Sequence, residues 1–203
     1  IHWPVVVVDE IAFPENGSQL VSLTKTTLSE TWEGMIDIKA SGLSKHIGVS
    51  NFSAKKIAAI WKDTGVKPEV DQVEMHPFMQ QKPLKGYTDE HGIILTAYAP
   101  LGSADRPASR ITPGDPNLFH DEVINAIAKE KAITPAQVML AWAVNYGVSV
   151  IPKSVRKERL IENLQAADIT LSPEEMQRLS AIDLHNRYIK GNFSDQYHVT
   201  VGV

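Results

Sequence analysis

Short apolar runs rich in β-branched residues alternate along the chain with longer segments in which apolar residues recur every three or four positions. This alternation predicts βαβ units, and therefore an α/β fold with a parallel sheet. We expect strands at residues 46–50, 70–75, 93–98 and 148–151. We expect helices at residues 28–41, 54–62, 121–131, 135–146 and 157–166, and a further helix after Ser172.

Several of these helices have clear boundary signals. The helix at 28–41 follows Thr26-Thr27, and Gly42 ends it. Pro135 suits the first position of a helix, where its missing N–H costs nothing. The segment Ser172-Pro173-Glu174-Glu175 is typical of an N-cap, a proline at the first helical position and an acidic first turn. Two stretches, 9–27 and 103–120, are rich in Pro, Gly, Ser and Asp and are expected to be loops.

Polar residues follow the apolar strands at their C-terminal ends. They are Ser50, Asn51, Gln72, Glu74, Tyr98, Lys153 and Ser154. In parallel α/β folds this edge of the sheet is where ligands bind. Singly, each has a structural alternative: Ser50-Asn51 could cap a helix, Gln72 could be a hydrogen-bonded core amide, and Tyr98 could pack in the core with a solvated hydroxyl. Their recurrence on successive strands favours a common binding edge.

Composition narrows the class of protein. The 203 residues are 43% hydrophobic and 22% charged, which is typical of one packed domain over residues 1–203. With 20 Lys and Arg against 24 Asp and Glu, and no long basic block, we expect neither a nucleic-acid nor a membrane partner. The absence of cysteine excludes a disulfide scaffold and a cysteine-bound metal. The apolar run at 5–8 is too short for a signal sequence or a membrane span, so we expect a cytoplasmic protein.

Five segments, in order over nearly the whole chain, carry a family resemblance. They are Ile1-His2-Trp3-Pro4, Gly48-Val49-Ser50-Asn51-Phe52, Gln72-Val73-Glu74-Met75-His76-Pro77, Tyr98-Ala99-Pro100-Leu101-Gly102-Ser103 and Ile151-Pro152-Lys153-Ser154-Val155. These segments resemble the motifs of the aldo-keto reductases. The resemblance implies a (β/α)₈ TIM barrel and NADPH-dependent reduction of an aldehyde or ketone to an alcohol. It also implies that the first barrel strands, with the family's catalytic Asp, Tyr and Lys, lie upstream of His2. We therefore expect a longer polypeptide that is monomeric at full length.

The resemblance also assigns roles by position. His2 resembles the histidine that orients the substrate carbonyl, and Trp3 a wall of the substrate pocket. The other matching positions resemble contacts to NADP(H): Ser50, Asn51 and Gln72 to the nicotinamide carboxamide, Tyr98 to the nicotinamide ring, Leu101 and Ser103 to the pyrophosphate, and Glu162 and Asn163 to adenine. The Lys153-Ser154-Val155 segment with a later arginine resembles the family's NADP(H)-binding segment.

The start of the helix at 157–166 independently suggests an anion site. Lys153 precedes it, and Arg156, Arg159 and Asn163 share one of its faces. Arginine binds phosphate through paired hydrogen bonds, and the N-terminal end of a helix favours negative charge. We therefore predict that the 2′-phosphate of NADPH binds here and that NADPH binds better than NADH. The alternative is a solvated basic helix start.

Other functions remain open from the sequence. The chain could be a nucleotide-binding or redox-sensing module that keeps the NADP(H) site without turnover. A metal hydrolase is suggested only by His2, His46, His76 and His91, which lack metal-site spacing, so we expect no metal. His2 could also be a frayed terminal residue. Candidate walls of the substrate pocket are Phe119, Tyr188, Phe193 and Tyr197.

Overall fold

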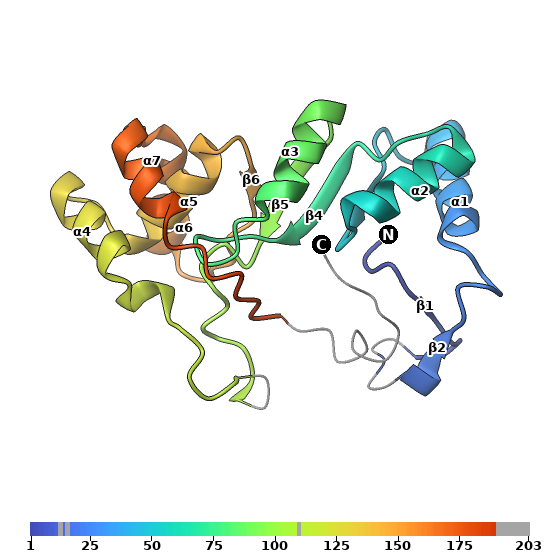
Figure 1. Cartoon of the computed structure of the whole chain (residues 1–203), viewed down its shortest axis with the longest axis horizontal. Helices are drawn as coiled ribbons and strands as arrows, with labels where there is room; N and C mark the ends of the chain where they lie inside the picture. The colour runs from blue at the N-terminus through green and yellow to red at the C-terminus, as the bar shows by residue number, and fades with distance from the viewer. Residues whose placement is uncertain (12–13, 15–16, 109–110, 190–203) are drawn as a thin grey trace. The chain divides into compact units, whose positions relative to one another are not determined.

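The computed structural model describes residues 1–11, 14, 17–108 and 111–189. The strands are β1 Val6–Val7, β2 Leu20–Val21, β3 Gly48–Ser50, β4 Val70–Glu74, β5 Ile94–Tyr98 and β6 Ser149–Val150. The helices are α1 Leu28–Ala40, α2 Ala54–Thr64, α3 Lys82–His91, α4 Glu122–Lys131, α5 Pro135–Asn145, α6 Lys157–Gln165 and α7 Pro173–Ser180 (Figure 1). Within the described residues there are also the short 3-10 turns η1 Gly17–Gln19, η3 Leu118–His120 and η4 Ala166–Asp168.

The described residues form two compact units. The first comprises 1–73 and 82–95, and the second comprises 74–81 and 96–189. In the first unit β3 and β4 pair in parallel with Ser50 opposite Gln72, and in the second unit β5 and β6 pair in parallel with Ala97 opposite Val150. The strand order is β3-β4-β5-β6. The predicted α/β fold with a parallel sheet is therefore confirmed, whereas a single domain over 1–203 stays a prediction.

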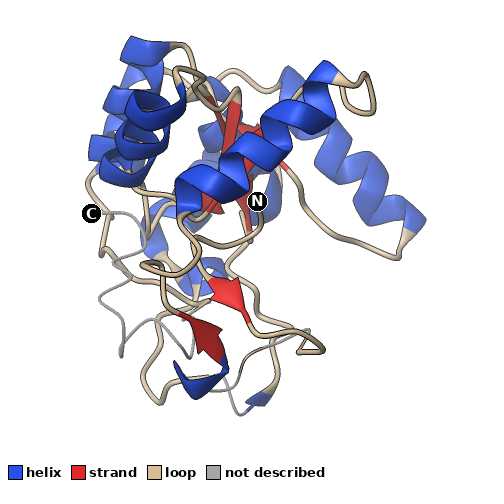
Figure 2. Cartoon of the chain, turned by 90° about the vertical axis from the view of Figure 1, so that its right-hand side faces the viewer, coloured by secondary structure: helices blue, strands red, loops and turns tan. Residues whose placement is uncertain are grey.

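The first unit packs α1 and α2 side by side, with α3 against α2 (Figure 1). The ring of Trp32 on α1 is fully buried, and its Nε1 donates to the carbonyl of Val66 at 2.8 Å. Other buried residues of this unit are Val49, Phe52, Ile57, Ile60, Val73, Leu84 and Leu95. The short strands β1 and β2 pair antiparallel and stand apart from the helices in Figure 2.

The second unit is built around α5, which is buried along seven consecutive positions, 137–143. Helix α5 packs against α4, α6, η4 and β6, and α7 packs against α4. The largest fully buried side chains of this unit are Met75, Leu118, Ile124, Ile127, Met139, Leu140 and Trp142. Helix α5 therefore packs against the two elements that flank Lys153 and Arg156, namely β6 and α6, and α6 also carries Arg159.

The predicted helix boundaries agree with the structure within about two residues where a cap is present. The side chains of Thr27, Thr134 and Ser172 each form a capping box, with Pro135 and Pro173 directly after the last two. Helix α3 was not predicted, because its sequence is largely polar and contains both a proline and a glycine. The strands predicted at 46–50 and 148–151 are shorter in the structure. The predicted loop at 9–27 contains η1 and β2, and η3 lies within the loop at 103–120.

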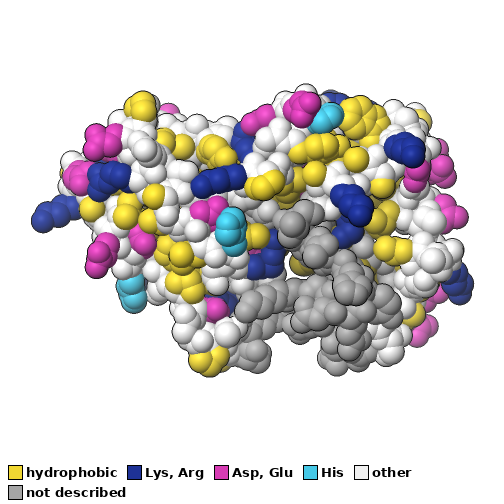
Figure 3. Space-filling view, in the orientation of Figure 1, with side chains coloured by type: hydrophobic (Ala, Val, Ile, Leu, Met, Phe, Trp, Pro, Cys, Tyr) yellow, Lys and Arg dark blue, Asp and Glu magenta, His cyan; other side chains and the backbone are white. Residues whose placement is uncertain are grey.

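On the face shown in Figure 3, acidic and basic side chains are interspersed rather than gathered into one basic stripe. Within the described ranges, no helix combines the length and apolar character needed to cross a bilayer.

Candidate functional site

In the first unit, three predicted cofactor residues lie together where the end of β3 pairs with the middle of β4. The hydroxyl of Ser50 donates to the carbonyl of Gln72 at 2.7 Å, and the backbone N–H of Asn51 donates to the same oxygen at 2.9 Å. Asn51 adopts the left-handed region with φ of 63°, a conformation that asparagine tolerates better than most residues. Helix α2 is capped by Ser53, so the interpretation of Ser50-Asn51 as its cap is wrong.

The N-terminal segment is joined to this group through its backbone. The nitrogen of Ile1 donates to the carbonyl of Gly48 at 2.9 Å, and the side-chain amide of Asn51 donates to the carbonyl of His2 at 3.1 Å. The His2 side chain is exposed, and its ring centroid lies 6.1 Å from that of Trp3. The structure therefore places His2 and Trp3 in the same unit as the three polar residues at the strand ends.

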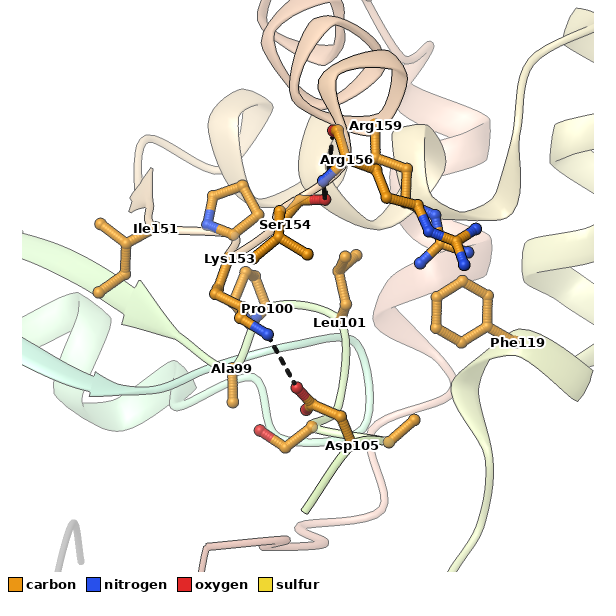
Figure 4. Close-up of a pocket in the computed structure, with 14 residues that line it drawn as sticks. Ala99, Pro100, Leu101, Asp105, Phe119, Ile151, Lys153, Ser154, Arg156 and Arg159 are labelled. Atoms are coloured by element: carbon orange, nitrogen blue, oxygen red, sulfur yellow. Dashed lines mark hydrogen bonds and ion pairs between the residues drawn. The ribbon is translucent and has the colours of Figure 1, made fainter.

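In the second unit, a cavity of about 410 Å³ lies at the ends of β5 and β6. Seven of the predicted cofactor residues line it: Leu101, Ser103, Lys153, Ser154, Val155, Arg156 and Arg159. Figure 4 shows the guanidinium groups of Arg156 and Arg159 on the side of the cavity where the ring of Phe119 lies. The structure places Phe119, a candidate wall of the substrate pocket, in the lining of this cavity.

The cavity carries an excess of positive charge. Its charged lining residues are Lys153, Arg156 and Arg159 against Asp105. The ammonium of Lys153 lies 3.6 Å from a carboxylate oxygen of Asp105, and both side chains are about three-quarters exposed (Figure 4). The backbone N–H of Arg156 donates to the hydroxyl of Ser154 at 3.2 Å, which shapes the turn into α6. Such a lining favours an anion.

Three predicted cofactor residues of the second unit lie outside the lining of this cavity. Tyr98 is the last residue of β5, one position before the cavity begins at Ala99. Glu162 accepts a hydrogen bond from the hydroxyl of Thr134, and Asn163 follows it on α6. Their contacts to adenine and nicotinamide stay predictions. Sequence reasoning did not identify Asp105, because a lone aspartate in a loop rich in Pro and Asp has no distinguishing local signal.

A second polar cluster of the same unit is centred on Glu74, at the end of β4. Glu74 and His76 are both fully shielded from solvent. The Glu74 carboxylate accepts the backbone N–H groups of Tyr188 at 2.6 Å and Ile189 at 3.0 Å. His76 Nε2 lies 3.1 Å from one of its oxygens, and a guanidinium nitrogen of Arg187 lies 3.7 Å from the other. Burial would raise the pKa of Glu74, but these donors and the Arg187 charge hold it below its usual value.

Tyr188 links this cluster to the loop before η3. Its hydroxyl donates to the carbonyl of Pro116 at 2.7 Å, and the guanidinium carbon of Arg106 lies 4.8 Å from the centre of its ring. Asp115 pairs with Arg106. Burial raises the pKa of Tyr188 to about 12. Tyr188 thus anchors this loop, while Phe193 and Tyr197, the other candidate pocket walls, lie outside the described residues.

His46 and His91, the other two histidines of the metal-hydrolase alternative, have local partners. His46 pairs with the carboxylate of Glu69, and the ring of His91 stacks on Tyr87 with 4.3 Å between the ring centres. Among the residues that the structure describes, no group of three or more His, Cys, Asp or Glu side chains could hold a metal ion.

Comparisons with known proteins agree on one family. The sequence model described as the aldo/keto reductase family matches residues 1–184. The chain is 48% identical over 193 residues to Aldo/keto reductase slr0942 of Synechocystis sp., an alignment that covers 95% of this chain and 59% of that protein. It is 38% identical over 190 residues to the Homo sapiens Aldo-keto reductase family 1 member A1, covering 93% of this chain and 58% of that protein.

A similar solved structure is the crystal structure of Gox0644 in its apo form. It superposes with a TM-score of 0.70 at 36% sequence identity, covering 79% of this chain and 55% of that chain. The chain therefore spans less than two thirds of the length of the relatives that it matches.

Proposed function

The chain belongs to the aldo/keto reductase family, and from this premise we propose that it contributes the cofactor site of an NADPH-dependent oxidoreductase that reduces aldehydes or ketones to alcohols. The substrate would be a small carbonyl compound, and we expect a cytoplasmic protein without nucleic-acid or membrane partners. The observation that carries the proposal is the cavity of the second unit, which Lys153, Arg156 and Arg159 all line.

The chemistry of this cavity suits the 2′-phosphate of NADPH. A dianionic phosphate needs charge and several hydrogen-bond donors, and two guanidinium groups supply both. Lys153 adds a point charge, while Leu101 and Ser103 line the same cavity and would follow the pyrophosphate. NADH has a hydroxyl in place of this phosphate, so it would not supply the negative charge that Arg156 and Arg159 favour.

The strand-end group of the first unit suits the nicotinamide end of the cofactor. Ser50, Asn51 and Gln72 offer hydroxyl and amide groups that both donate and accept, which matches a carboxamide. We propose that Tyr98 stacks on the nicotinamide ring and that Glu162 and Asn163 contact adenine. The bound cofactor supplies the hydride.

His2 and Trp3 would act on the substrate. An exposed imidazole can donate a hydrogen bond to the substrate carbonyl and orient it, and the neighbouring indole would wall the pocket. We propose that the general acid that protonates the product oxygen lies in the part of the relatives that this chain does not cover.

Cofactor titration tests the proposal. NADPH and NADH are titrated by fluorescence at fixed salt into the wild type, Arg159→Ala and the control Arg178→Ala, whose arginine lies on α7 and pairs with Glu130. We expect NADPH to bind at least about tenfold more tightly than NADH, equivalent to about 1.4 kcal/mol. Arg159→Ala should remove most of that preference, and Arg178→Ala should leave it unchanged. Equal affinity of the wild type for both cofactors would refute the assignment.

An activity assay separates the enzyme from its alternative. Oxidation of NADPH is followed with a generic aldehyde as substrate and with a protein of the relatives' full length, which includes the part proposed to carry the general acid. Turnover by this longer protein supports the oxidoreductase, whereas tight NADPH binding without turnover favours a nucleotide-binding or redox-sensing module.

A further inference from the structure

The loop that follows β5, residues 99–103, turns sharply beside the cavity of the second unit. Ala99, Gly102 and Ser103 all adopt the left-handed region, with φ of 49°, 82° and 48°. Residues other than glycine adopt this region at a cost, so Ala99 and Ser103 must be held there by their surroundings. Leu101 and Ser103 line the cavity. The shape of this loop therefore determines which groups it offers to a ligand in the cavity.

The side chain of Arg106 binds the backbone of this loop. One guanidinium nitrogen donates to the carbonyl of Ser103 at 3.2 Å and lies 3.5 Å from the carbonyl oxygen of Gly102. The backbone N–H of Arg106 donates to the same Ser103 oxygen at 3.1 Å. Two donors of one residue thus hold the carbonyl of the left-handed Ser103. Arg106 is not among the described residues that line the cavity, so its effect on a ligand there is indirect.

Arg106 is in turn held by two neighbours. Its second guanidinium nitrogen donates to the carboxylate of Asp115, and the two side chains are only 8% and 10% exposed. The same carboxylate oxygen accepts the backbone N–H of Thr112 at 3.1 Å. The guanidinium carbon lies 4.8 Å from the centre of the Tyr188 ring. A planar guanidinium can bind a carboxylate and two carbonyls together because its N–H groups point in fixed, different directions.

The loop is also packed closely against the ring that Arg106 covers. A Cβ atom on Gly102 would lie 2.8 Å from the side chain of Leu118 and 3.1 Å from the ring of Tyr188. The Tyr188 ring is itself fixed, because its hydroxyl donates to the carbonyl of Pro116 at 2.7 Å. The backbone at Gly102 therefore lies between a fixed aromatic ring and the cavity-lining residues on either side of it.

We propose that Arg106 is a positioning residue, which holds the loop 99–103 in the shape in which Leu101 and Ser103 meet the pyrophosphate of the cofactor. The inference rests on the function proposed above for these two residues. Without the guanidinium, Ser103 loses a donor to its carbonyl, and the loop can relax toward ordinary backbone conformations. Binding of the pyrophosphate should then weaken. Binding of the 2′-phosphate should not, because its proposed partner Arg159 lies on α6.

Two fragments of NADPH separate these contacts. The compound 2′-phospho-ADP-ribose carries the 2′-phosphate and the pyrophosphate without the nicotinamide, and 2′-AMP carries the 2′-phosphate alone. Dissociation constants are measured by calorimetry for the first fragment and by displacement of fluorescent NADPH for the second. The proteins are the wild type, Arg106→Met and the matched control Arg178→Met, which makes the same substitution at the α7 arginine that pairs with Glu130.

We expect Arg106→Met to weaken only the fragment that contains the pyrophosphate. Its dissociation constant should rise about tenfold, equivalent to about 1.4 kcal/mol, because a misplaced loop loses hydrogen bonds to a charged group. The dissociation constant of 2′-AMP should stay unchanged, and Arg178→Met should change neither. A residue that only stabilises the fold would not distinguish the two fragments.

Folding is checked by thermal unfolding in parallel. Arg106→Met keeps the aliphatic stem of the side chain but leaves the carboxylate of Asp115 without its ion pair, which destabilises a protein when the charge is buried. The double variant Arg106→Met/Asp115→Asn removes both charges together and should be more stable than the single variant. It lacks the same guanidinium, so the same selective loss is expected.

The inference is wrong if the folded variants bind 2′-phospho-ADP-ribose as the wild type does, or if they lose as much affinity for 2′-AMP. It is also wrong if neither variant folds, because Arg106 would then support the whole unit rather than the loop. A wild type that binds 2′-phospho-ADP-ribose no more tightly than 2′-AMP would instead refute the proposed contact of Leu101 and Ser103 with the pyrophosphate, and the inference with it.

Discussion

Strand β4 carries a buried carboxyl group toward each end, Asp71 in the first unit and Glu74 in the second, and the two have opposite electrostatics. Both residues are fully shielded from solvent. Glu74 accepts two backbone N–H groups and lies beside His76 and Arg187. Neither oxygen of Asp71 has a hydrogen-bond partner among the described residues. Burial raises the pKa of Asp71 to about 8, opposed only by the nearby backbone N–H of Phe52, while the pKa of Glu74 is lowered.

The contrast shows that burial alone does not determine the charge of a carboxyl group. Desolvation favours the protonated form at both positions, and only the donors around Glu74 outweigh it. Asp71 is therefore mainly protonated at neutral pH, and Glu74 is ionised. The first behaves as a neutral polar residue in the core of its unit, whereas the second organises the segment that carries Arg187.

The largest effect is expected from Glu74→Ala. Removing the carboxylate takes away the acceptor of the N–H groups of Tyr188 and Ile189 and the negative charge beside the Arg187 guanidinium. Breaking a buried ion pair in this way typically costs about 3 to 5 kcal/mol. For a chain of this size we expect the melting temperature, measured by circular dichroism, to fall by about 10 °C or more.

Glu74→Gln is the matched control, since it keeps the size of the side chain and one accepting oxygen. It should destabilise less than Glu74→Ala. Because the folded pKa of Glu74 is lowered, its stabilising contribution is present above the unfolded pKa and is lost as pH falls through the folded pKa. The difference between wild type and Glu74→Gln should therefore shrink below about pH 4. A difference that is independent of pH would contradict the ionised assignment.

The next effect has the opposite sign. The pKa of Asp71 is 3.8 in the unfolded chain and about 8 in the folded chain, so the unfolded chain ionises first as the pH rises. The free energy of unfolding therefore falls between these two pH values. Asp71→Asn, which is neutral at every pH, should therefore stabilise the protein, by more at pH 9 than at pH 5. We expect a gain of several degrees in melting temperature at pH 9, at about 2 to 4 °C per kcal/mol. If the wild type and Asp71→Asn had equal melting temperatures at pH 9, the Asp71 carboxylate would have to be stabilised by a hydrogen-bond donor.

Local sequence signals predicted the elements well where a cap or an apolar pattern is present. Thr27, Pro135 and Ser172 each mark the start of a helix that the structure contains. Helix α3 was missed, because its polar sequence lacks a wide apolar face and only Leu84, Lys85 and Thr88 are buried. Such a helix is stabilised by its packing rather than by a periodicity that the sequence displays.

The candidate site was predictable to a similar extent. The strand-end pattern and the family resemblance identified Ser50, Gln72 and the lining of the charged cavity. The environment of Glu74 was not predictable, because its partners Tyr188 and Ile189 lie 114 and 115 residues further along the chain. Asp71 was not singled out, since no local pattern distinguishes a buried aspartate with donors from one without.

A smaller effect tests whether a neutral hydrogen bond, in addition to the charge of Glu74, stabilises the segment around Tyr188. Tyr188→Phe removes only the hydrogen bond to the carbonyl of Pro116 and keeps the ring under Arg106. A neutral hydrogen bond contributes about 1 kcal/mol, so the melting temperature should fall by about 2 to 4 °C. A loss as large as that of Glu74→Gln would mean that the loop contact, rather than the carboxylate, holds this segment.

The smallest effect is expected at Glu69, a third carboxylate one residue before β4. Lys39 and His46 hydrogen-bond to it and lower its pKa to about 2. Its side chain is 30% exposed, and that of Lys39 is 42% exposed, so water and salt screen the pair. The contribution of Glu69 is present above its unfolded pKa and is lost only as pH falls toward about 2.

Despite this large pKa shift, Glu69→Gln should cost less than about 1 kcal/mol at pH 7, and the cost should nearly vanish in about 1 M salt. Melting temperatures at low and high salt measure this. If Glu69→Gln lowered the melting temperature as much as Glu74→Gln does, independently of salt, then the exposed Glu69 would stabilise the protein as strongly as the buried Glu74.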